Sequence, residues 1–476
     1  MEEQLKDNDA SQNVSMSMGF KEKRLYYKCD KCGWSKNFIK GFYTSCEVCN
    51  EAISLEYNID LNNTLNLSGK SAGVWRYSSL LPDFSQKTTL GEGGTFLSKA
   101  KRLRQVFKLK NLFIKDERTN PTGAFTDRGA ALVAAAALHY GFRELWSFTG
   151  GDIAASLAAY AAASGLKLTV NFEDHPQIEK LYQVVFFGGE VRRFKKAKAG
   201  AYNVTPKDPF LVEGYKTIAF ELFEDLSEVD VVVIPVGHGV LAFSVWKGFN
   251  ELKRFGFIEK LPRIVGVQAS GCKPIVDAFE MGLEKPVECK ECYTIARELL
   301  VKYPLRGKDV LKALRDSRGY AVAVDDADIV DSLRMLAKYE GLLVETASAA
   351  VVAGLKKLLE EKIVDRDEVV VLIATGAGIK HPQTLLRILE MDDRKTLPHI
   401  GKTSLRILSL LSENESHGYA IWRWLAEKYN ISKPAVYYHL KRLEELGLIR
   451  KLSFPDRKIY VITEKGLKVV KKLKSR

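Results

Sequence analysis

The chain has 476 residues, of which 46% are apolar and 28% charged, a globular composition with ample material for a large core. This length excludes a single ordinary domain. Residues 401–476 hold 17 basic and 7 acidic side chains, whereas the first 400 residues hold 55 and 52. A nearly neutral body therefore precedes a small basic region, and this charge predicts a phosphate-rich or otherwise anionic partner for that region.

Residues 1–20 are polar, rich in Ser, Asn, Asp and Met, and lack periodicity, so we interpret them as a disordered tail. They contain no apolar segment of the kind found in secretory signals. Apolar runs farther along, such as Ala130–Leu138, are too short to span a membrane. We therefore expect a cytoplasmic protein with no membrane partner, in which seven cysteines do not form a disulfide framework.

Two C-x2-C pairs lie within residues 26–57. Cys29 and Cys32 form the first pair, and Cys46 and Cys49 form the second after thirteen intervening residues. Each pair fits a tight turn whose backbone amides can point at the sulfurs, and four thiolates suit a tetrahedral Zn²⁺ ion. The doubled spacing predicts a zinc ribbon with one structural zinc per chain, because four thiolates leave no coordination position for a substrate.

Three cysteines remain, namely Cys272, Cys289 and Cys292. The last two form a third C-x2-C pair, which is consistent with a partial metal site or a redox pair. Because no fourth ligand is visible nearby in the sequence, we favour the simpler interpretation that all three are incidental thiols beside an insertion.

Residues 75–391 alternate short β-branched runs with Ala- and Leu-rich helical patterns. The β-branched runs begin at Leu112, Val229, Ile264 and Glu368. This alternation predicts a wound, mainly parallel α/β sheet. The next stretch, 392–402, is charged and contains Pro398 and Gly401, so we expect a linker there.

Eight separated motifs follow one another in this body. They are Leu90-Gly-Glu-Gly-Gly-Thr95, Lys115-Asp-Glu117, Asn120-Pro-Thr-Gly-Ala-Phe-Thr-Asp-Arg-Gly129, Glu213-Gly-Tyr-Lys-Thr-Ile-Ala-Phe220, Trp246-Lys-Gly-Phe249, Val265-Gly-Val-Gln268, Glu345-Thr-Ala-Ser-Ala-Ala350 and Thr375-Gly-Ala-Gly-Ile-Lys380. In content and order they resemble the threonine synthase family, in which an N-terminal zinc ribbon also occurs. The resemblance implies fold type II of pyridoxal-phosphate (PLP) enzymes, with two α/β lobes and the cofactor in the cleft between them.

The same resemblance places Thr126 where the family has the lysine that forms an imine with PLP. A threonine hydroxyl cannot form an imine, so PLP is not expected as a covalent cofactor. Asp152, which follows Gly151, stands where the family has an asparagine that supports the phenolic oxygen of the cofactor. The carboxylate would face that electron-rich oxygen.

The phosphate-binding loop of the family corresponds to Gly237, His238, Gly239, Val240 and Leu241. Such loops need small residues so that backbone amides can reach the phosphate, and the last two residues remove that freedom. Thr375, at the position that faces the pyridine nitrogen, is retained. Departures at three separate contacts of one cofactor predict a catalytically degenerate site.

Three lysines in family-like motifs, Lys115, Lys216 and Lys247, are alternative positions for an imine. We favour structural or surface roles for them, because such chemistry needs positioning within about 1 Å.

From Thr403 to the end of the chain, at 476, helical periodicity returns. Two helices are expected around Leu405–Leu411 and His417–Tyr429, and Ser432 can cap a third. Two strands then flank the turn Phe454-Pro-Asp-Arg457, and a lysine-rich helix ends the region. On the third helix the apolar stripe consists of Val436, Leu440, Leu443 and Leu446.

Three helices and a two-stranded wing define a winged helix-turn-helix, and the segment from Ser432 onward resembles the PadR and ArsR regulator groups. The candidate DNA-contacting residues are Lys433, Tyr437, Tyr438, Lys441 and Arg442 on the third helix, with Arg457 and Lys458 at the wing. An oligomerisation domain with a solvated charged face is the alternative. The net charge of +10 favours double-stranded DNA as the partner.

These features predict a DNA-binding transcriptional regulator, dimeric like many PLP proteins of this fold, with a degenerate threonine-synthase-like sensor body. The expected effector is an amino acid, a phosphorylated amino acid or a nucleotide-like anion. Two alternatives remain. One is a working PLP-dependent lyase with an appended regulatory domain, and the other is a scaffold that controls a true threonine synthase.

Overall fold

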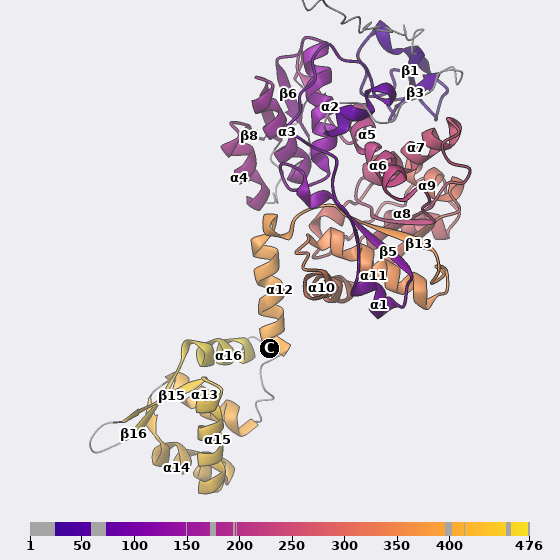
Figure 1. Ribbon diagram of the computed structural model, residues 1–476. Helices are drawn as coiled ribbons and strands as arrows, with labels where there is room; N and C mark the ends of the chain where they lie inside the picture. The colour runs from indigo at the N-terminus through magenta and orange to yellow at the C-terminus, as the bar shows by residue number, and fades with distance from the viewer. Residues whose placement is uncertain are drawn as a thin grey trace, which may run out of the picture. The chain divides into compact units, whose positions relative to one another are not determined.

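The computed structural model describes residues 24–58, 73–148, 150–171, 178–193, 196, 198–395, 402–413, 415–453 and 458–474. The chain divides into two compact units, Met1–Leu385 and Leu386–Arg476, and each has its own hydrophobic core (Figure 1). The predicted tail, 1–20, lies outside the described residues. Within the described part of the chain, no helix has both the length and the apolar character needed to cross a membrane.

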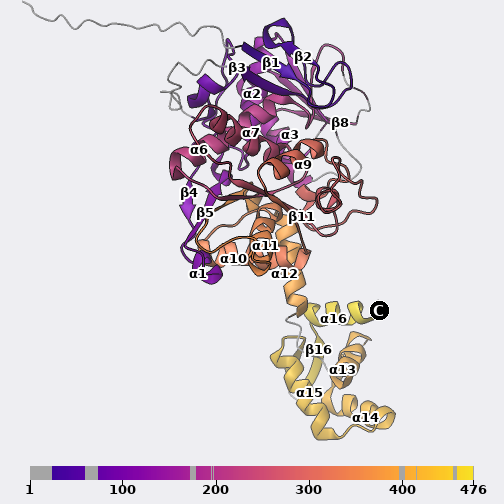
Figure 2. The same ribbon diagram turned by 90° about the vertical axis from the view of Figure 1, so that its right-hand side faces the viewer.

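The N-terminal cysteine module is built on a small antiparallel sheet of order β2-β1-β3. The strands are β1 (Arg24–Lys28), β2 (Ser35–Asn37) and β3 (Ser54–Asn58). Phe38 and Phe42 extend from this module onto the body, where both rings pack against Phe210. The module therefore shares its core with the body. It lies near α2 (Thr126–His139), as Figure 2 shows, and its strand β3 contacts α5 (Pro209–Tyr215).

The larger sheet of the body has the order β12-β11-β10-β13-β5-β4 and is parallel except for β4. Its strands are β4 (Leu97–Lys99), β5 (Asn111–Asp116), β10 (Val231–Pro235), β11 (Arg263–Ala269), β12 (Tyr320–Val324) and β13 (Val369–Ala374). Every residue of β10 is buried, as expected for a central parallel strand covered on both faces. The prediction of a mainly parallel α/β sheet is confirmed, and all four predicted β-branched runs form strands of this sheet.

The helices and turns around the larger sheet include α11, which packs against β10, β11, β12 and β13. They are α1 (Leu103–Phe107), α7 (Val240–Arg254), α8 (Pro274–Glu280), α9 (Gly307–Asp316), α10 (Asp326–Met335), α11 (Thr346–Glu360), the 3₁₀ turns η3 (Glu117–Thr119), η4 (Arg297–Leu299) and η6 (Gly378–Lys380), and the π turn η5 (Leu336–Glu340). The 3₁₀ turn η2 (Gly73–Leu80) contacts α6 (Thr217–Leu226) through Tyr77 and Phe220, and α12 (Pro382–Lys395) crosses the boundary between the two units. Helix α12 extends to Lys395, so part of the stretch 392–402, predicted as a linker, is helical.

The smaller sheet is parallel, with the order β8-β7-β6-β9. Its strands and helices are β6 (Glu144–Ser147), β7 (Lys167–Asn171), β8 (Glu190–Arg192), β9 (Tyr202–Val204), α2 (Thr126–His139), α3 (Gly151–Ala163), α4 (Ile178–Phe186), α5 (Pro209–Tyr215) and α6 (Thr217–Leu226). Helix α5 crosses α2 at Gly214, where an added Cβ would lie only 2.2 Å from the Arg128 carbonyl oxygen. This glycine is therefore required by packing.

The described part of the C-terminal unit contains the end of α12, four further helices and a three-stranded sheet of order β14-β16-β15. The elements are α13 (Lys402–Glu413), β14 (Ser416–His417), α14 (Gly418–Tyr429), α15 (Lys433–Glu445), β15 (Ile449–Ser453), β16 (Lys458–Ile462) and α16 (Glu464–Lys474). The sequence predicts the helices and the hairpin but not β14, which is only two residues long and pairs with Ile459 and Tyr460. Ser432 precedes α15 as expected, but its side chain makes no capping hydrogen bond.

Candidate functional site

The four N-terminal cysteines meet at one point between two similar turns. The Cys29 carbonyl accepts from Gly33 N and the Cys46 carbonyl accepts from Asn50 N, at 3.0 and 2.9 Å. Sulfur separations are 3.6 Å for Cys29–Cys49, 3.5 Å for Cys32–Cys46 and 3.7 Å for Cys32–Cys49. Four sulfurs about 2.3 Å from one ion in a tetrahedron are separated by similar distances. The donor set fits a closed zinc site.

The loops singled out in the sequence come together where the two lobes of the body meet. Phe125 N donates to the Thr375 carbonyl at 3.0 Å, and Ala377 N donates to the Gly123 carbonyl at 2.9 Å. The start of α2 on one lobe therefore contacts the end of β13 on the other. Thr126, Asp152 and Thr375 all belong to these contacting segments or to the adjacent start of α3.

Thr126 is the first residue of α2, and its side chain is buried. Its Oγ1 lies 2.7 Å from Ser156 Oγ, which in turn lies 3.1 Å from Thr122 Oγ1. Thr122 donates to the buried Asp127 carboxylate at 2.7 Å. The Thr126 hydroxyl thus belongs to a chain of hydrogen bonds that links the first turn of α2 to the second turn of α3.

Asp152 follows Gly151 in the first turn of α3 and forms an ion pair with Lys380. Its Oδ1 is 2.7 Å from Lys380 Nζ, and both side chains are at most 10% exposed. The lysine stem passes Gly123, where an added Cβ would be 3.4 Å from Lys380 Cδ. Lys380 ends the Thr375 motif, but it is not among the site residues predicted from the sequence. The only indication of a role in the site was a basic residue next to two glycines of that motif.

Thr375 and His381 lie among carboxylates. Thr375 donates to Glu345 at 2.7 Å and lies 2.8 Å from Ser348 Oγ. His381 Nε2 is 3.4 Å from Glu345 and 3.2 Å from Glu298. This junction of the lobes therefore contains both acidic and basic side chains, most of which are in contact with one another. The sequence motifs gave no sign that Glu298 reaches this place.

The loop from Gly237 to Leu241 leads into α7. Gly239 has φ of +88°, and an added Cβ at Gly237 would lie 2.6 Å from the Glu298 carbonyl oxygen. His238 accepts from Arg306 N at 3.0 Å through its carbonyl, and burial lowers the pKa of its imidazole to about 4. The imidazole is therefore neutral at pH 7. Val240 and Leu241 are buried.

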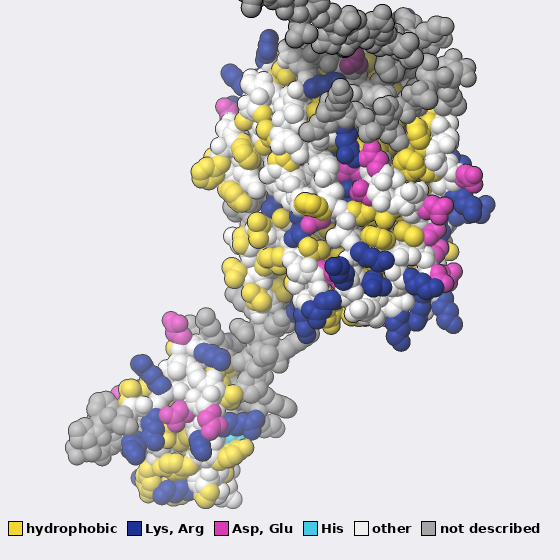
Figure 3. Space-filling view, viewed as in Figure 1, with side chains coloured by type: hydrophobic (Ala, Val, Ile, Leu, Met, Phe, Trp, Pro, Cys, Tyr) yellow, Lys and Arg dark blue, Asp and Glu magenta, His cyan; other side chains and the backbone are white. Residues whose placement is uncertain are grey.

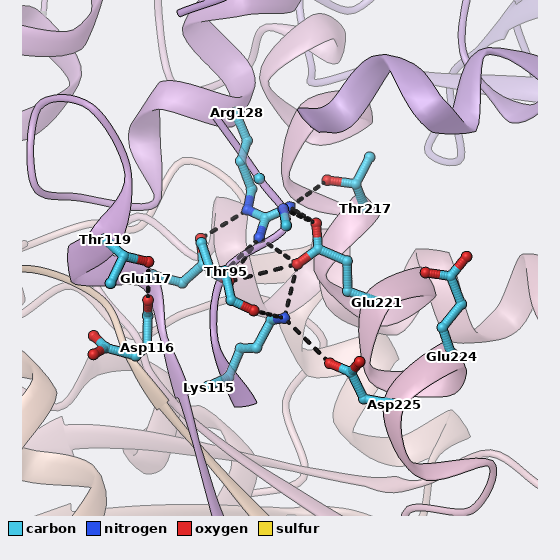
Figure 4. A network of polar contacts seen from close by, with 12 residues as sticks. Thr95, Lys115, Asp116, Glu117, Thr119, Arg128, Thr217, Glu221, Glu224 and Asp225 are labelled. Atoms are coloured by element: carbon cyan, nitrogen blue, oxygen red, sulfur yellow. Dashed lines mark hydrogen bonds and ion pairs between the residues drawn. The ribbon is translucent and has the colours of Figure 1, made fainter. Parts of the chain in front are cut away.

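The lysines proposed as alternative imine positions are held in buried ion pairs. Lys115 lies 2.8 Å from Glu221 and donates to the Thr95 carbonyl (Figure 4). Arg128 binds the same Glu221 and also Glu117, each at 2.7 Å. Burial opposes ionisation of Glu221, but Arg128 and Lys115 hold its pKa well below the usual value.

Lys216 and Lys247 make a second buried group with Glu213 and Glu251. Both ammonium groups lie near the ring of Tyr57 from the cysteine module, 4.1 and 5.3 Å from its centre. Both lysines are therefore held by ion pairs and by the Tyr57 ring, as expected for structural residues.

The C-terminal unit exposes most of the predicted DNA-contacting side chains. The described ones are Lys433, Tyr437, Tyr438, Lys441 and Arg442 on α15 and Lys458 at the start of β16, all of which are exposed. Arg457 lies outside the described residues. On the opposite side of α15, Val436, Leu440 and Leu443 are buried in the core of the unit and Leu446 is partly buried, as the predicted stripe requires.

Comparison with known proteins gives two family matches. Residues 88–376 match the pyridoxal-phosphate dependent enzyme family, and residues 407–472 match the PadR-like family of transcriptional regulators. A threonine synthase of Methanocaldococcus jannaschii is 38% identical over 388 residues, which cover 77% of this chain and 95% of the relative. One from Methanosarcina acetivorans is 33% identical over 386 residues, which cover 77% of this chain and 94% of the relative. An L-serine ammonia-lyase structure from Rhizomucor miehei matches with a TM-score of 0.55 and 20% identity, covering 62% of this chain and 97% of that structure.

Proposed function

Because the chain belongs to the pyridoxal-phosphate dependent enzyme family and also carries a PadR-like regulator domain, we propose that it is a DNA-binding transcriptional regulator. Its threonine-synthase-like body is a catalytically degenerate sensor. An amino acid or a phosphorylated amino acid is the expected effector, bound in the cleft at Thr126, Asp152 and the loop 237–241. The regulator acts as a homodimer in the cytoplasm.

The residue at position 126 is the main argument that the body is catalytically degenerate. The residue there is a buried threonine whose hydroxyl is hydrogen-bonded to Ser156, so it supplies no amine to an aldehyde. When bound in this family of enzymes, PLP supplies an electron sink to an imine-linked substrate. Without the amine at this position, that chemistry has no covalent anchor.

The other cofactor contacts also fit PLP poorly. Asp152, where an amide is expected, is a carboxylate already paired with Lys380. In the loop 237–241, Gly237 packs against the Glu298 carbonyl, and His238 is a neutral imidazole. The phosphate of PLP would be stabilised by free backbone amides and by cations. The neutral His238 supplies no such cation. We therefore assign no catalytic step to the group.

DNA recognition is assigned to α15 and the wing. Tyr437, Tyr438, Lys441 and Arg442 approach base edges and phosphates in the major groove, and Arg457 and Lys458 contact the flanking backbone. Lys433 Nζ lies 5.4 Å from the ring centres of Tyr419 and Trp422 on α14, which places a cation at the start of the recognition helix. In a dimer, two such helices would read half-sites about 34 Å apart.

Two measurements on the purified full chain test the proposal. Footprinting across the genome should give site-selective protection that changes with a panel of amino acids and phosphorylated amino acids. Absorbance and borohydride reduction with added PLP should give no imine band and no pyridoxyl-lysine. Absence of salt-sensitive DNA binding would overturn the regulator assignment in favour of a scaffold that binds a true threonine synthase, detectable by pull-down from native extract.

A threonine-synthase-like lyase is the second candidate, and Lys380 favours it. This lysine places a buried amine beside Asp152 in the same cleft. A borohydride-stable adduct on Lys380, together with threonine formation from O-phosphohomoserine, would establish this candidate. The adduct without turnover would overturn the prediction that no imine forms, and the footprinting would then decide separately whether the chain regulates transcription.

A further inference from the structure

The three cysteines outside the N-terminal module lie together in the structure. Cys272 follows β11, whereas Cys289 and Cys292 belong to the loop between α8 and η4. Their sulfur atoms all lie within 4.8 Å of one another, and the Cys272 and Cys292 sulfurs are 2.7 Å apart. The sequence did not predict that the three sulfurs meet, because Cys272 reaches the C-x2-C pair only through the fold.

The backbone around this cluster is closely fitted. An added Cβ at Gly271 would lie 2.2 Å from the Tyr293 carbonyl oxygen, so only glycine permits this approach. Tyr293 N donates to the Gly271 carbonyl at 3.0 Å, and Cys289 N donates to the Lys302 carbonyl at 3.0 Å. These contacts fix the loop against the end of β11 and point the three sulfurs at one place.

The cluster differs from the N-terminal one in both oxidation state and ligand number. Cys289 and Cys292 form a disulfide with Cα atoms 5.9 Å apart, and Cys272 is a free thiol. Reduction of the disulfide by a cellular dithiol would transfer two electrons and two protons to Cys289 and Cys292, and the dithiol would become a disulfide. Three thiols would then face one point, with no fourth His, Cys, Asp or Glu ligand among the described residues.

We propose that reduced Cys272, Cys289 and Cys292 form a binding site for a thiophilic metal ion such as Zn²⁺ or Cd²⁺. Three thiolates bind the ion and release their protons, and the fourth coordination position stays open to water or a small anion. Cys272 is fully buried, whereas Cys289 and Cys292 are only partly buried, so the ion has a path from solvent. The proposal is independent of DNA binding and of PLP.

The site is connected to the cleft by the chain itself. Six residues after Cys292, Glu298 contacts His381 through its side chain and lies against Gly237 through its carbonyl. Thr294 and Ile295 donate to Asp326 at 2.6 and 3.0 Å and hold the intervening segment. An ion on the three sulfurs would therefore stabilise the segment that lies against Gly237.

Metal analysis of the full chain tests the proposal. Reduced protein dialysed against Zn²⁺ should retain about two equivalents per chain, one in the N-terminal module and one here. Cys272→Ser should lose one equivalent, and Ser270→Ala, a neighbour with no sulfur, should lose none. Replacement by Co²⁺ should give thiolate charge-transfer bands that weaken in Cys272→Ser. About one equivalent in reduced parent protein would overturn the site.

A second measurement does not depend on variants. In the reduced parent protein, Cd²⁺ should protect Cys272, Cys289 and Cys292 from alkylation, as located by mass spectrometry. Oxidation with a mild thiol oxidant should release that second equivalent, and renewed reduction should restore it. Alkylation of all three residues at the same rate with and without Cd²⁺ would contradict the proposal, even if a cysteine variant failed to fold.

Discussion

The body and the C-terminal unit place their lysine and arginine side chains in contrasting environments. In the body, Arg128, Lys115, Lys216 and Lys247 are almost fully buried, and each contacts at least one buried carboxylate. In the C-terminal unit, several basic side chains lie on the visible face (Figure 3), and the lysines and Arg442 of α15 are exposed. The charges of these four body residues are neutralised within the fold, whereas the exposed charges of α15 are available to a partner.

This difference explains why motif similarity and function can diverge in one chain. The family-like motifs around Lys115, Arg128 and Glu213 belong to buried ion-pair networks, so loss of one partner would destabilise the fold whether or not the site is catalytic. The exposed basic residues of α15 and β16 in the C-terminal unit make no such contribution to folding. Their concentration on one helix and one strand is therefore the stronger indication of function.

The largest expected effect comes from removing the central cation of the body. Arg128→Met leaves Glu117 and Glu221 buried without their main partner. Breaking a buried pair from one side costs about 3–5 kcal/mol. We expect the free energy of unfolding of the body to fall by that amount, as measured by urea denaturation followed by tryptophan fluorescence. An unchanged midpoint would show that Lys115 alone can compensate both carboxylates.

The second prediction concerns the ion pair in the cleft. Lys380→Met leaves Asp152 nearly buried and without its cation, which should cost about 1–3 kcal/mol. The double variant Asp152→Asn with Lys380→Met should recover most of that loss, because both charges are then absent. A double-mutant cycle on urea unfolding measures the coupling. Additive losses would mean that the two side chains are not coupled in solution.

A considerable part of the fold could be predicted from the sequence, because it depends on local patterns. The β-branched runs at Leu112, Val229, Ile264 and Glu368 form strands, and the stripe of Val436, Leu440 and Leu443 faces a core. Spacing within one short segment also located the four-cysteine site. In each case the information lies within a few turns or strands of chain.

The parts that could not be predicted depend on contacts between distant segments. Lys380 reaches Asp152 and Cys272 reaches Cys292 only when the lobes and loops have folded. Glu298 lies in a loop without a recognisable motif, and nothing in its neighbourhood signals that it contacts His381. Local periodicity predicts which helices and strands form. Which distant residues meet in a site depends on how those elements are connected and packed.

The exposed charges of the smaller unit should affect binding rather than stability. Each lysine that neutralises a phosphate contributes about 0.9 to the slope of log affinity against log salt. Lys441→Ala combined with Lys458→Ala should therefore reduce the slope by about two and weaken binding to all sequences. Fluorescence anisotropy on duplex DNA across a salt series measures this. Lys260→Ala, an exposed lysine of the body, is the matched control and should leave the slope unchanged.

The smallest expected change in stability comes from breaking an exposed ion pair in the C-terminal unit, in contrast to the buried pairs of Arg128. Arg423 lies on α14 and pairs with Glu427 at 3.0 Å, but both side chains are largely exposed. Water already solvates both charges, so the pair adds little and salt screens what remains. Arg423→Ala should leave the unfolding midpoint of this unit within experimental error of the parent, as followed by circular dichroism. A loss approaching that of Arg128→Met would show that Arg423 has a structural role that its exposure does not suggest.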